Sequence, residues 1–130
     1  MASADFFVFC RRAFIRNNSV DVEGISRLIV AERVPFTFGQ DYVLAVIWSS
    51  ISTTFQPSLA IEQRNQQTQY HRISSNVSDA FDVMLQIVRL DSVIITSLDE
   101  ITFKLMDDQT EAARTSISVT KLPSERSTFA

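Results

Sequence analysis

The chain has very little of the residue types that build common catalytic and metal centres. Its 130 residues include one cysteine, one histidine and two glycines. Structural zinc needs about four nitrogen or sulfur ligands, so one cysteine and one histidine exclude such a site within a single chain. Gly24 and Gly39 are too few to form a glycine-rich loop that cradles phosphate. We therefore expect no cofactor and no metal.

Cys10 and His71 also give little support for nucleophilic catalysis, because they fall in separate expected strands. No serine lies in a Gly-x-Ser-x-Gly pattern. Cys10 stands in an apolar run, where a free cysteine usually behaves as a small buried hydrophobe. His71 lies between Tyr70 and Arg72, as an ordinary strand residue would. The sequence predicts that the protein is not an enzyme.

Long hydrophobic runs and an excess of positive charge are absent as well. No apolar run approaches the roughly 20 residues of a membrane-spanning helix. Twelve basic and fifteen acidic residues give a net charge of −3, so no overall positive field attracts phosphate backbones. The N-terminus lacks the basic region and apolar stretch of a secretory signal. We expect a cytoplasmic protein without a membrane partner.

Arginines are nevertheless concentrated in the N-terminal third. They are Arg11, Arg12, Arg16, Arg27 and Arg33. A platform for single-stranded nucleic acid interleaves such arginines with exposed aromatic rings. Core packing explains the neighbouring phenylalanines more simply, and the arginines are typical of a solvated rim. Nucleic acid is therefore an unlikely partner.

What the sequence does have is a high apolar content, 45% with ten phenylalanines, which predicts a real core. A chain of this length fits one domain. We place that domain at residues 1–119. The segment 120–130 contains a proline, serines and mixed charges, and we expect it to be a flexible tail.

Two short segments, 6–10 and 42–48, are apolar on both faces of an expected strand, whereas period-two alternation prevails elsewhere. In an ordinary two-layer fold, the second face of each sheet is polar and exposed to solvent. The chain thus has more apolar surface than one core needs, and we expect a partner to cover the surplus.

For the segment 42–48, we assign Val43, Ala45 and Ile47 to the core. The alternate residues would then face outward and form a partner-binding surface: Tyr42, Leu44, Val46 and Trp48. Contiguous exposed apolar patches are rare on monomers, and aromatic residues often anchor interfaces. We expect a protein partner, most simply a second copy in a homo-oligomer. The alternative is that a helix or loop of the same chain covers this face.

Alternation and turn residues predict most of the strands. They span about 6–15, 25–34, 41–51, 58–63, 70–73, 101–105 and 113–119. The last two would form a hairpin around Asp107 to Thr110, with odd-numbered side chains on the core face. The acidic pairs Asp107-Asp108 and Asp99-Glu100 could supply oxygen ligands to calcium, but loop acids are more often turn formers.

The segment 81–90 allows two interpretations. Asp82, Gln86 and Arg89 recur at helical spacing, and Ser78 could cap a helix there. A strand fits the segment equally well. An α+β fold with one helix near 81–90 is therefore the alternative to an all-β fold.

In the order of its elements, the chain resembles a family of small uncharacterised bacterial domains with an immunoglobulin-like β-sandwich. The resemblance rests on the cysteine-containing strand 6–10, on a second apolar strand that ends at Val34-Pro35-Phe36, and on the C-terminal hairpin from Ile101 to Val119. It implies a fold and supplies no activity.

Together these observations predict an all-β, immunoglobulin-like antiparallel β-sandwich of seven or eight strands. The expected function is that of a non-enzymatic protein-interaction or structural module that self-associates. The alternative is a ligand-binding or enzymatic domain whose pocket is assembled from scattered residues.

Overall fold

The computed structural model describes residues 2–17, 19–51, 54–64, 66–73 and 83–121, and every regular element in these ranges is a strand. The eleven strands are β1 (Ser3–Arg16), β2 (Ser19–Ile25), β3 (Leu28–Ala31), β4 (Phe36–Thr37), β5 (Val43–Ser49), β6 (Pro57–Gln63), β7 (Gln69–Arg72), β8 (Met84–Arg89), β9 (Ile94–Ile95), β10 (Glu100–Asp107) and β11 (Thr110–Lys121). The all-β prediction is confirmed for the described residues. The described strands outnumber the seven or eight expected, partly because β4 and β9 are two-residue strands.

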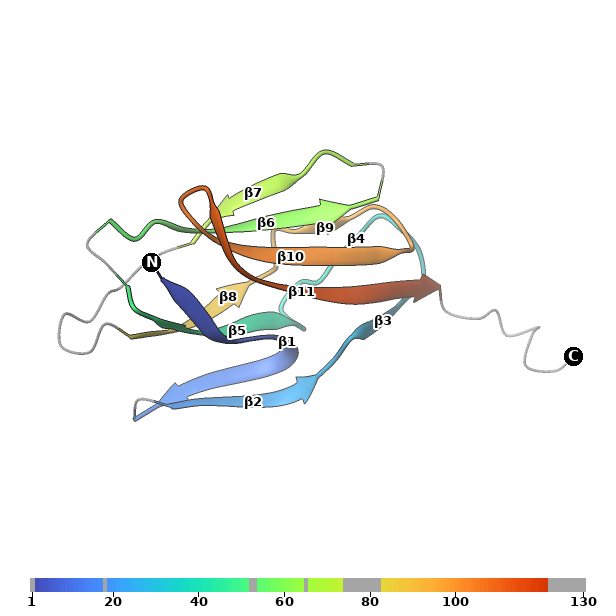
Figure 1. Cartoon of the computed structure of the whole chain (residues 1–130). Helices are drawn as coiled ribbons and strands as arrows, with labels where there is room; N and C mark the ends of the chain where they lie inside the picture. Colours follow the sequence, from blue (N-terminus) through green and yellow to red (C-terminus); the bar gives the residue numbers. More distant parts are fainter. Residues whose placement is uncertain (1, 18, 52–53, 65, 74–82, 122–130) are drawn as a thin grey trace, which may run out of the picture.

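Two main sheets form separate layers (Figure 1). The first has the order β2-β1-β5-β8 and the second the order β3-β11-β10-β6-β7, while β4 and β9 pair with each other. All pairings are antiparallel except that of β3 with β11. The arrangement fits the predicted β-sandwich.

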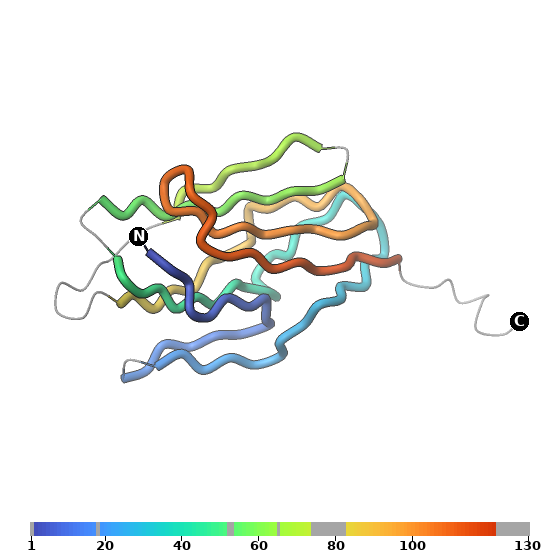
Figure 2. The backbone as a smooth tube through the Cα atoms, viewed as in Figure 1, coloured from blue at the N-terminus to red at the C-terminus, as the bar shows by residue number. Residues whose placement is uncertain are grey.

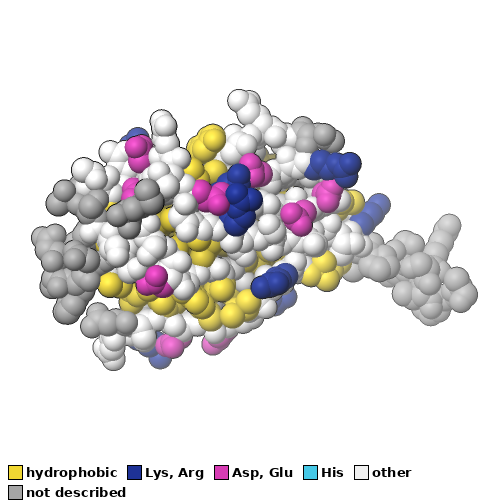
Figure 3. All heavy atoms as spheres, in the orientation of Figure 1, with side chains coloured by type: hydrophobic (Ala, Val, Ile, Leu, Met, Phe, Trp, Pro, Cys, Tyr) yellow, Lys and Arg dark blue, Asp and Glu magenta, His cyan; other side chains and the backbone are white. Residues whose placement is uncertain are grey.

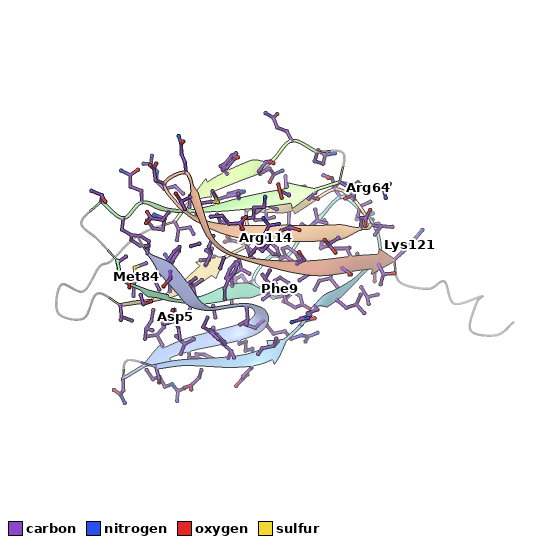
Figure 4. All side chains as sticks on the ribbon, viewed as in Figure 1. Asp5, Phe9, Arg64, Met84, Arg114 and Lys121 are labelled. Carbon is purple, nitrogen blue, oxygen red and sulfur yellow. The ribbon has the colours of Figure 1, made fainter. Side chains whose placement is uncertain are left out.

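The core lies between the two main sheets and takes side chains from both. Phe9 of β1, labelled in Figure 4, illustrates this. Its ring stacks on that of Phe103 in the opposite sheet, with 5.8 Å between the centroids. Trp48 is fully buried and packs edge-on against Phe55 at 4.8 Å. Large buried aromatic rings of this kind dominate the energetics of a core.

The C-terminal hairpin is as predicted. Strands β10 and β11 pair antiparallel, and Asp108 in the turn between them has a left-handed φ of 55°, which aspartate tolerates better than most residues. Ile101, Phe103, Leu105, Ile117 and Val119 are all buried in the core. The odd-numbered side chains therefore share the core face, as alternation indicated.

The helix expected as an alternative near 81–90 is wrong for the residues that the structure describes. Met84–Arg89 is strand β8, paired with β5. Met84, Gln86 and Val88 face the core, while Leu85 and Ile87 lie on the other face. Residues 81 and 82, with the possible cap at 78, lie outside the described residues.

The expected strand at 25–34 is also divided differently. Ser19–Ile25 forms β2 against β1, and a separate strand β3 pairs with β11 in the other sheet. The chain thus crosses from one layer to the other between Ile25 and Leu28, where Ser26 Oγ accepts a hydrogen bond from the Leu28 amide. At the C-terminal end, β11 continues to Lys121, two residues past the expected boundary at 119. Residues 122–130 lie outside the described residues.

The long strand β1 changes direction in its middle (Figure 2). Its first half pairs with β5 as far as Cys10, and beyond that point it pairs with β2 alone. Gly24 stands opposite this change with a φ of 69°, and a Cβ there would lie 3.1 Å from the Arg11 side chain. The left-handed conformation and the close approach both require glycine. Beyond the turn, β1 and β2 form a two-stranded ribbon that runs back below the first sheet in the view of Figure 2.

Candidate functional site

The structure reverses the faces that we assigned to the strand around residues 42–48. Leu44, Val46 and Trp48 are each fully buried in the core cluster, where the second sheet covers them. Tyr42 is half-buried and packs against the same cluster. The assignment of these four residues to an outward, partner-binding face is therefore wrong. The reason is that both faces of the segment are apolar, so alternation could not say which one meets the other sheet.

The residues that we assigned to the core, Val43, Ala45 and Ile47, lie instead on the outer face of the first sheet. The strand register places Val8 beside Ala45 and Phe6 beside Ile47 on one side. On the other side the register partners are Ile87 and Leu85, respectively. We call this set the outer apolar face: Phe6, Val8, Cys10, Val43, Ala45, Ile47, Leu85 and Ile87.

None of these eight residues belongs to the core cluster between the sheets. Cys10 and Ala45 are nevertheless fully buried, whereas the six larger side chains keep part of their surface. The six larger residues therefore carry the exposed part of this face. Ile25, which pairs with Cys10, extends this surface on β2 and is 57% exposed.

The outer face of the second sheet is different in kind. Lys104 of β10 forms ion pairs with Glu62 at 2.8 Å and with Glu111 at 3.8 Å. Glu111 in turn contacts Arg114 at 2.8 Å. Figure 3 views the molecule from this side and shows charged side chains gathered in the middle of the face. The outer face of this sheet is polar and exposed to solvent, as expected for a two-layer fold.

A surface cleft of about 490 Å³ opens where β1 leaves β5. Its walls come from the middle of β1, the loop before β5 and the end of β8. Arg11, Arg12 and Arg89 bring three guanidinium groups to the cleft, and Tyr42 and Phe14 bring aromatic rings. Tyr42 is thus the one member of the predicted partner-binding set that lines this cleft.

Tyr42 is held in place by contacts on both the core and the cleft sides. Its ring stacks on Phe9 with 4.8 Å between centroids and 11° between planes, and the Arg11 guanidinium lies 5.7 Å from the Tyr42 ring centroid. Offset or stacked rings and a cation over a ring are both favourable geometries. The sequence offered one signal of this site, the local concentration of arginines.

The other candidates from the sequence are not brought together. Burial raises the pKa of the Cys10 thiol, and the thiol donates a hydrogen bond to the Arg12 carbonyl oxygen at 3.4 Å. His71 lies on β7, in the other sheet, where its Nε2 is buried without a hydrogen-bond partner. Nothing among the described contacts joins these two groups into a catalytic pair.

The loop carboxylates are engaged in turns and ion pairs. Asp107 Oδ1 accepts a hydrogen bond from the Gln56 amide at 3.1 Å. Asp99 accepts one from Arg64 at 2.9 Å and another from the Glu100 amide at 2.7 Å. The hydrogen bond from Arg64 holds the pKa of Asp99 below its ordinary value. Within the described ranges, no three His, Cys, Asp or Glu side chains are grouped as metal ligands would be.

No family model and no curated protein matches the chain in comparisons with known proteins. The resemblance to a bacterial family therefore stays a prediction. In the part of the chain that the structure describes, no helix has the length and apolar character needed to cross a membrane.

Proposed function

We propose that the protein is a non-enzymatic association module with an immunoglobulin-like sandwich, and that it pairs with a second copy through the outer apolar face. The observation that carries this proposal is the contrast between the two outer faces: one bears an ion-pair network, and the other bears eight apolar residues on three adjacent strands.

The strand order supports the immunoglobulin-like part of the proposal. Strands β5 and β8 pair in one sheet, while β6, β10 and β11 follow one another in the other. The chain crosses between the sheets from β5 to β6, from β7 to β8 and from β8 to β10. These crossings match the Greek-key path of immunoglobulin-like domains, with β5 and β8 in the places of the second and fifth strands.

The size of the outer apolar face suits a second copy. Three strands about 4.8 Å apart and about five residues of ~3.4 Å each give an apolar centre of roughly 250 Å². A surrounding rim about 6 Å wide raises this to roughly 750 Å², close to the ~800 Å² per partner of a standard interface. Two such faces can stack as sheets do in a sandwich, about 10 Å apart.

The charges beside the face also permit self-association. A border of one sign would repel a second copy. Here Arg12 and its register partner Glu23 lie on the two-stranded ribbon of β1 and β2, and Arg89 pairs with Val43. The border thus carries both signs, so two copies can meet without a like-charged contact.

The first test is molar mass by light scattering coupled to gel filtration. We expect a mass above the 14.7 kDa of the monomer at high micromolar concentration. Ile47→Lys, in the outer apolar face, should shift the protein to monomer because the interface would bury an unpaired charge. Val30→Lys is the matched control, since Val30 is an exposed apolar strand residue on β3. A wild type that stays monomeric would overturn the proposal.

Cross-linking provides a second test that does not depend on loss of association. In a Cys10→Ser background, Ile47→Cys would place the only thiol on the outer apolar face. A short bifunctional maleimide should then yield a covalent dimer. Val30→Cys in the same background should not. Equal yields from both positions would show that this face does not mediate the pairing.

A further inference from the structure

The cleft at the end of the outer apolar face is not explained by self-association. Its volume of about 490 Å³ falls in the range of small-molecule sites, roughly 300–1,000 Å³. An adjoining smaller hollow shares Arg11, Arg12 and Tyr42 and adds Asp41 to the rim. The space is large enough for a molecule with a ring and a charged group.

The charges of the cleft favour an anion. Arg11, Arg12 and Arg89 line it together with one carboxylate, Asp91. Within the described residues, the ion pairs of arginine and lysine involve Arg64, Lys104 and Arg114, and none includes the three arginines of the cleft. Guanidinium groups bind phosphate through paired, charge-assisted hydrogen bonds. Unpaired arginines around a hollow are therefore suited to a phosphate group.

The aromatic rings of the cleft favour a planar group beside that anion. Tyr42 is fixed by its stacking on Phe9, so its position is set before any ligand arrives. Phe14 also lines the cleft and is 40% exposed, and the Arg16 guanidinium lies 5.6 Å from the centroid of its ring. Nucleic-acid bases stack favourably on aromatic rings of this kind. Asp91 provides an acceptor for an amino or hydroxyl group of the same ligand.

We infer that the cleft binds a small aromatic phosphate of the size of a nucleoside monophosphate. Arg11 and Arg12 bind the phosphate group, and Tyr42 contacts the ring. The inference does not rest on self-association, because Arg11 and Tyr42 lie outside the outer apolar face. Four residues belong to the cleft and also to the outer apolar face or its border: Arg12, Val43, Ile87 and Arg89. The variant that separates the two proposals is therefore at Tyr42.

Isothermal titration calorimetry with adenosine monophosphate tests the inference. Adenosine and ribose 5-phosphate are the matched probes that lack the phosphate or the base. We expect the whole nucleotide to bind and each half to bind at least about tenfold more weakly, since a charge-assisted hydrogen bond or a stacked base accounts for such a factor. No binding at millimolar nucleotide, or equal binding of either half, would overturn the inference.

Variants of the cleft locate the binding. Arg11→Gln combined with Arg12→Gln should lower the affinity for the nucleotide by more than about tenfold. Tyr42→Leu should lower the affinity for the nucleotide and leave the affinity for ribose 5-phosphate unchanged. Arg64→Gln is the control, because Arg64 is an exposed arginine engaged with Asp99 elsewhere. An affinity unchanged in the double arginine variant would exclude the cleft as the binding site.

The light-scattering experiment separates this inference from the proposed function. Tyr42→Leu should keep the molar mass of the wild type, and Ile47→Lys should keep the affinity for the nucleotide. Either proposal can therefore fail while the other stands.

Discussion

The buried hydrogen bond between Trp48 and Gln86 allows a sharp test of how this core tolerates a polar residue. The indole Nε1–H donates to Gln86 Oε1 at 2.9 Å, Trp48 is fully buried, and Gln86 is 8% exposed. Gln86→Leu removes the acceptor and leaves the indole N–H in the core. Because an orphaned buried donor costs about 1–3 kcal/mol, we expect the free energy of unfolding to fall by about 2 kcal/mol.

Urea unfolding provides the measurement. Trp48 is the only tryptophan of the chain, so its fluorescence reports both the local environment and global unfolding. A loss of about 2 kcal/mol lowers the midpoint by roughly 1 M when the slope is about 1–3 kcal/mol per molar urea. The folded-state emission of Gln86→Leu should shift to the blue, because the indole loses its polar partner.

A double-mutant cycle tests whether the orphaned indole N–H causes the loss of stability in Gln86→Leu. In a Trp48→Phe background there is no donor to orphan, so Gln86→Leu should cost at least about 1 kcal/mol less than in the wild type. Circular dichroism follows unfolding in that background. An equal cost in both backgrounds would refute the reasoning and assign the effect to packing of the Gln86 side chain.

Two further predictions concern single ionisable groups. Cys10 is fully buried and its thiol pKa is raised by that burial, so a thiol reagent at neutral pH should react with the folded protein much more slowly than with the protein in urea; equal rates would show that Cys10 is accessible. Asp99 has a lowered pKa through its hydrogen bond from Arg64, so its interaction stabilises the fold above the unfolded pKa and is lost as pH falls through the lower folded pKa. A carboxyl titration by NMR should place Asp99 below its ordinary 3.8, and Arg64→Gln should move it back up; a value unaffected by that substitution would contradict the assigned cause.

The C-terminal hairpin shows where the sequence was sufficient. Its two strands alternate apolar and polar residues, so only one face can meet the core, and the turn residues lie close in sequence to both strands. Local pattern and tertiary packing agree there. The first half of β1 and β5 were also predicted as strands, because their β-prone residues need no distant partner to be recognised.

The segment 83–90 shows where local pattern was ambiguous. Gln86 suggested the polar face of a helix, yet it lies in the core of a strand with its oxygen bound to Trp48. A buried polar residue is acceptable only when its partner is in place, and that partner is 38 residues away. The pairing of β3 with β11 is similarly non-local, since it joins Leu28–Ala31 to residues 118–121.

The sequence by itself determined that the chain is rich in strands and carries more apolar surface than one core requires. Only the tertiary structure decided which face of β5 is the surplus. Both faces of that strand are apolar, so period-two alternation cannot predict which of them packs against the second sheet. The arginine cleft likewise depends on the tertiary structure. Its walls come from residues 11–14, 39–43 and 87–91, which no spacing rule connects, because only folding brings them to one end of the sheet.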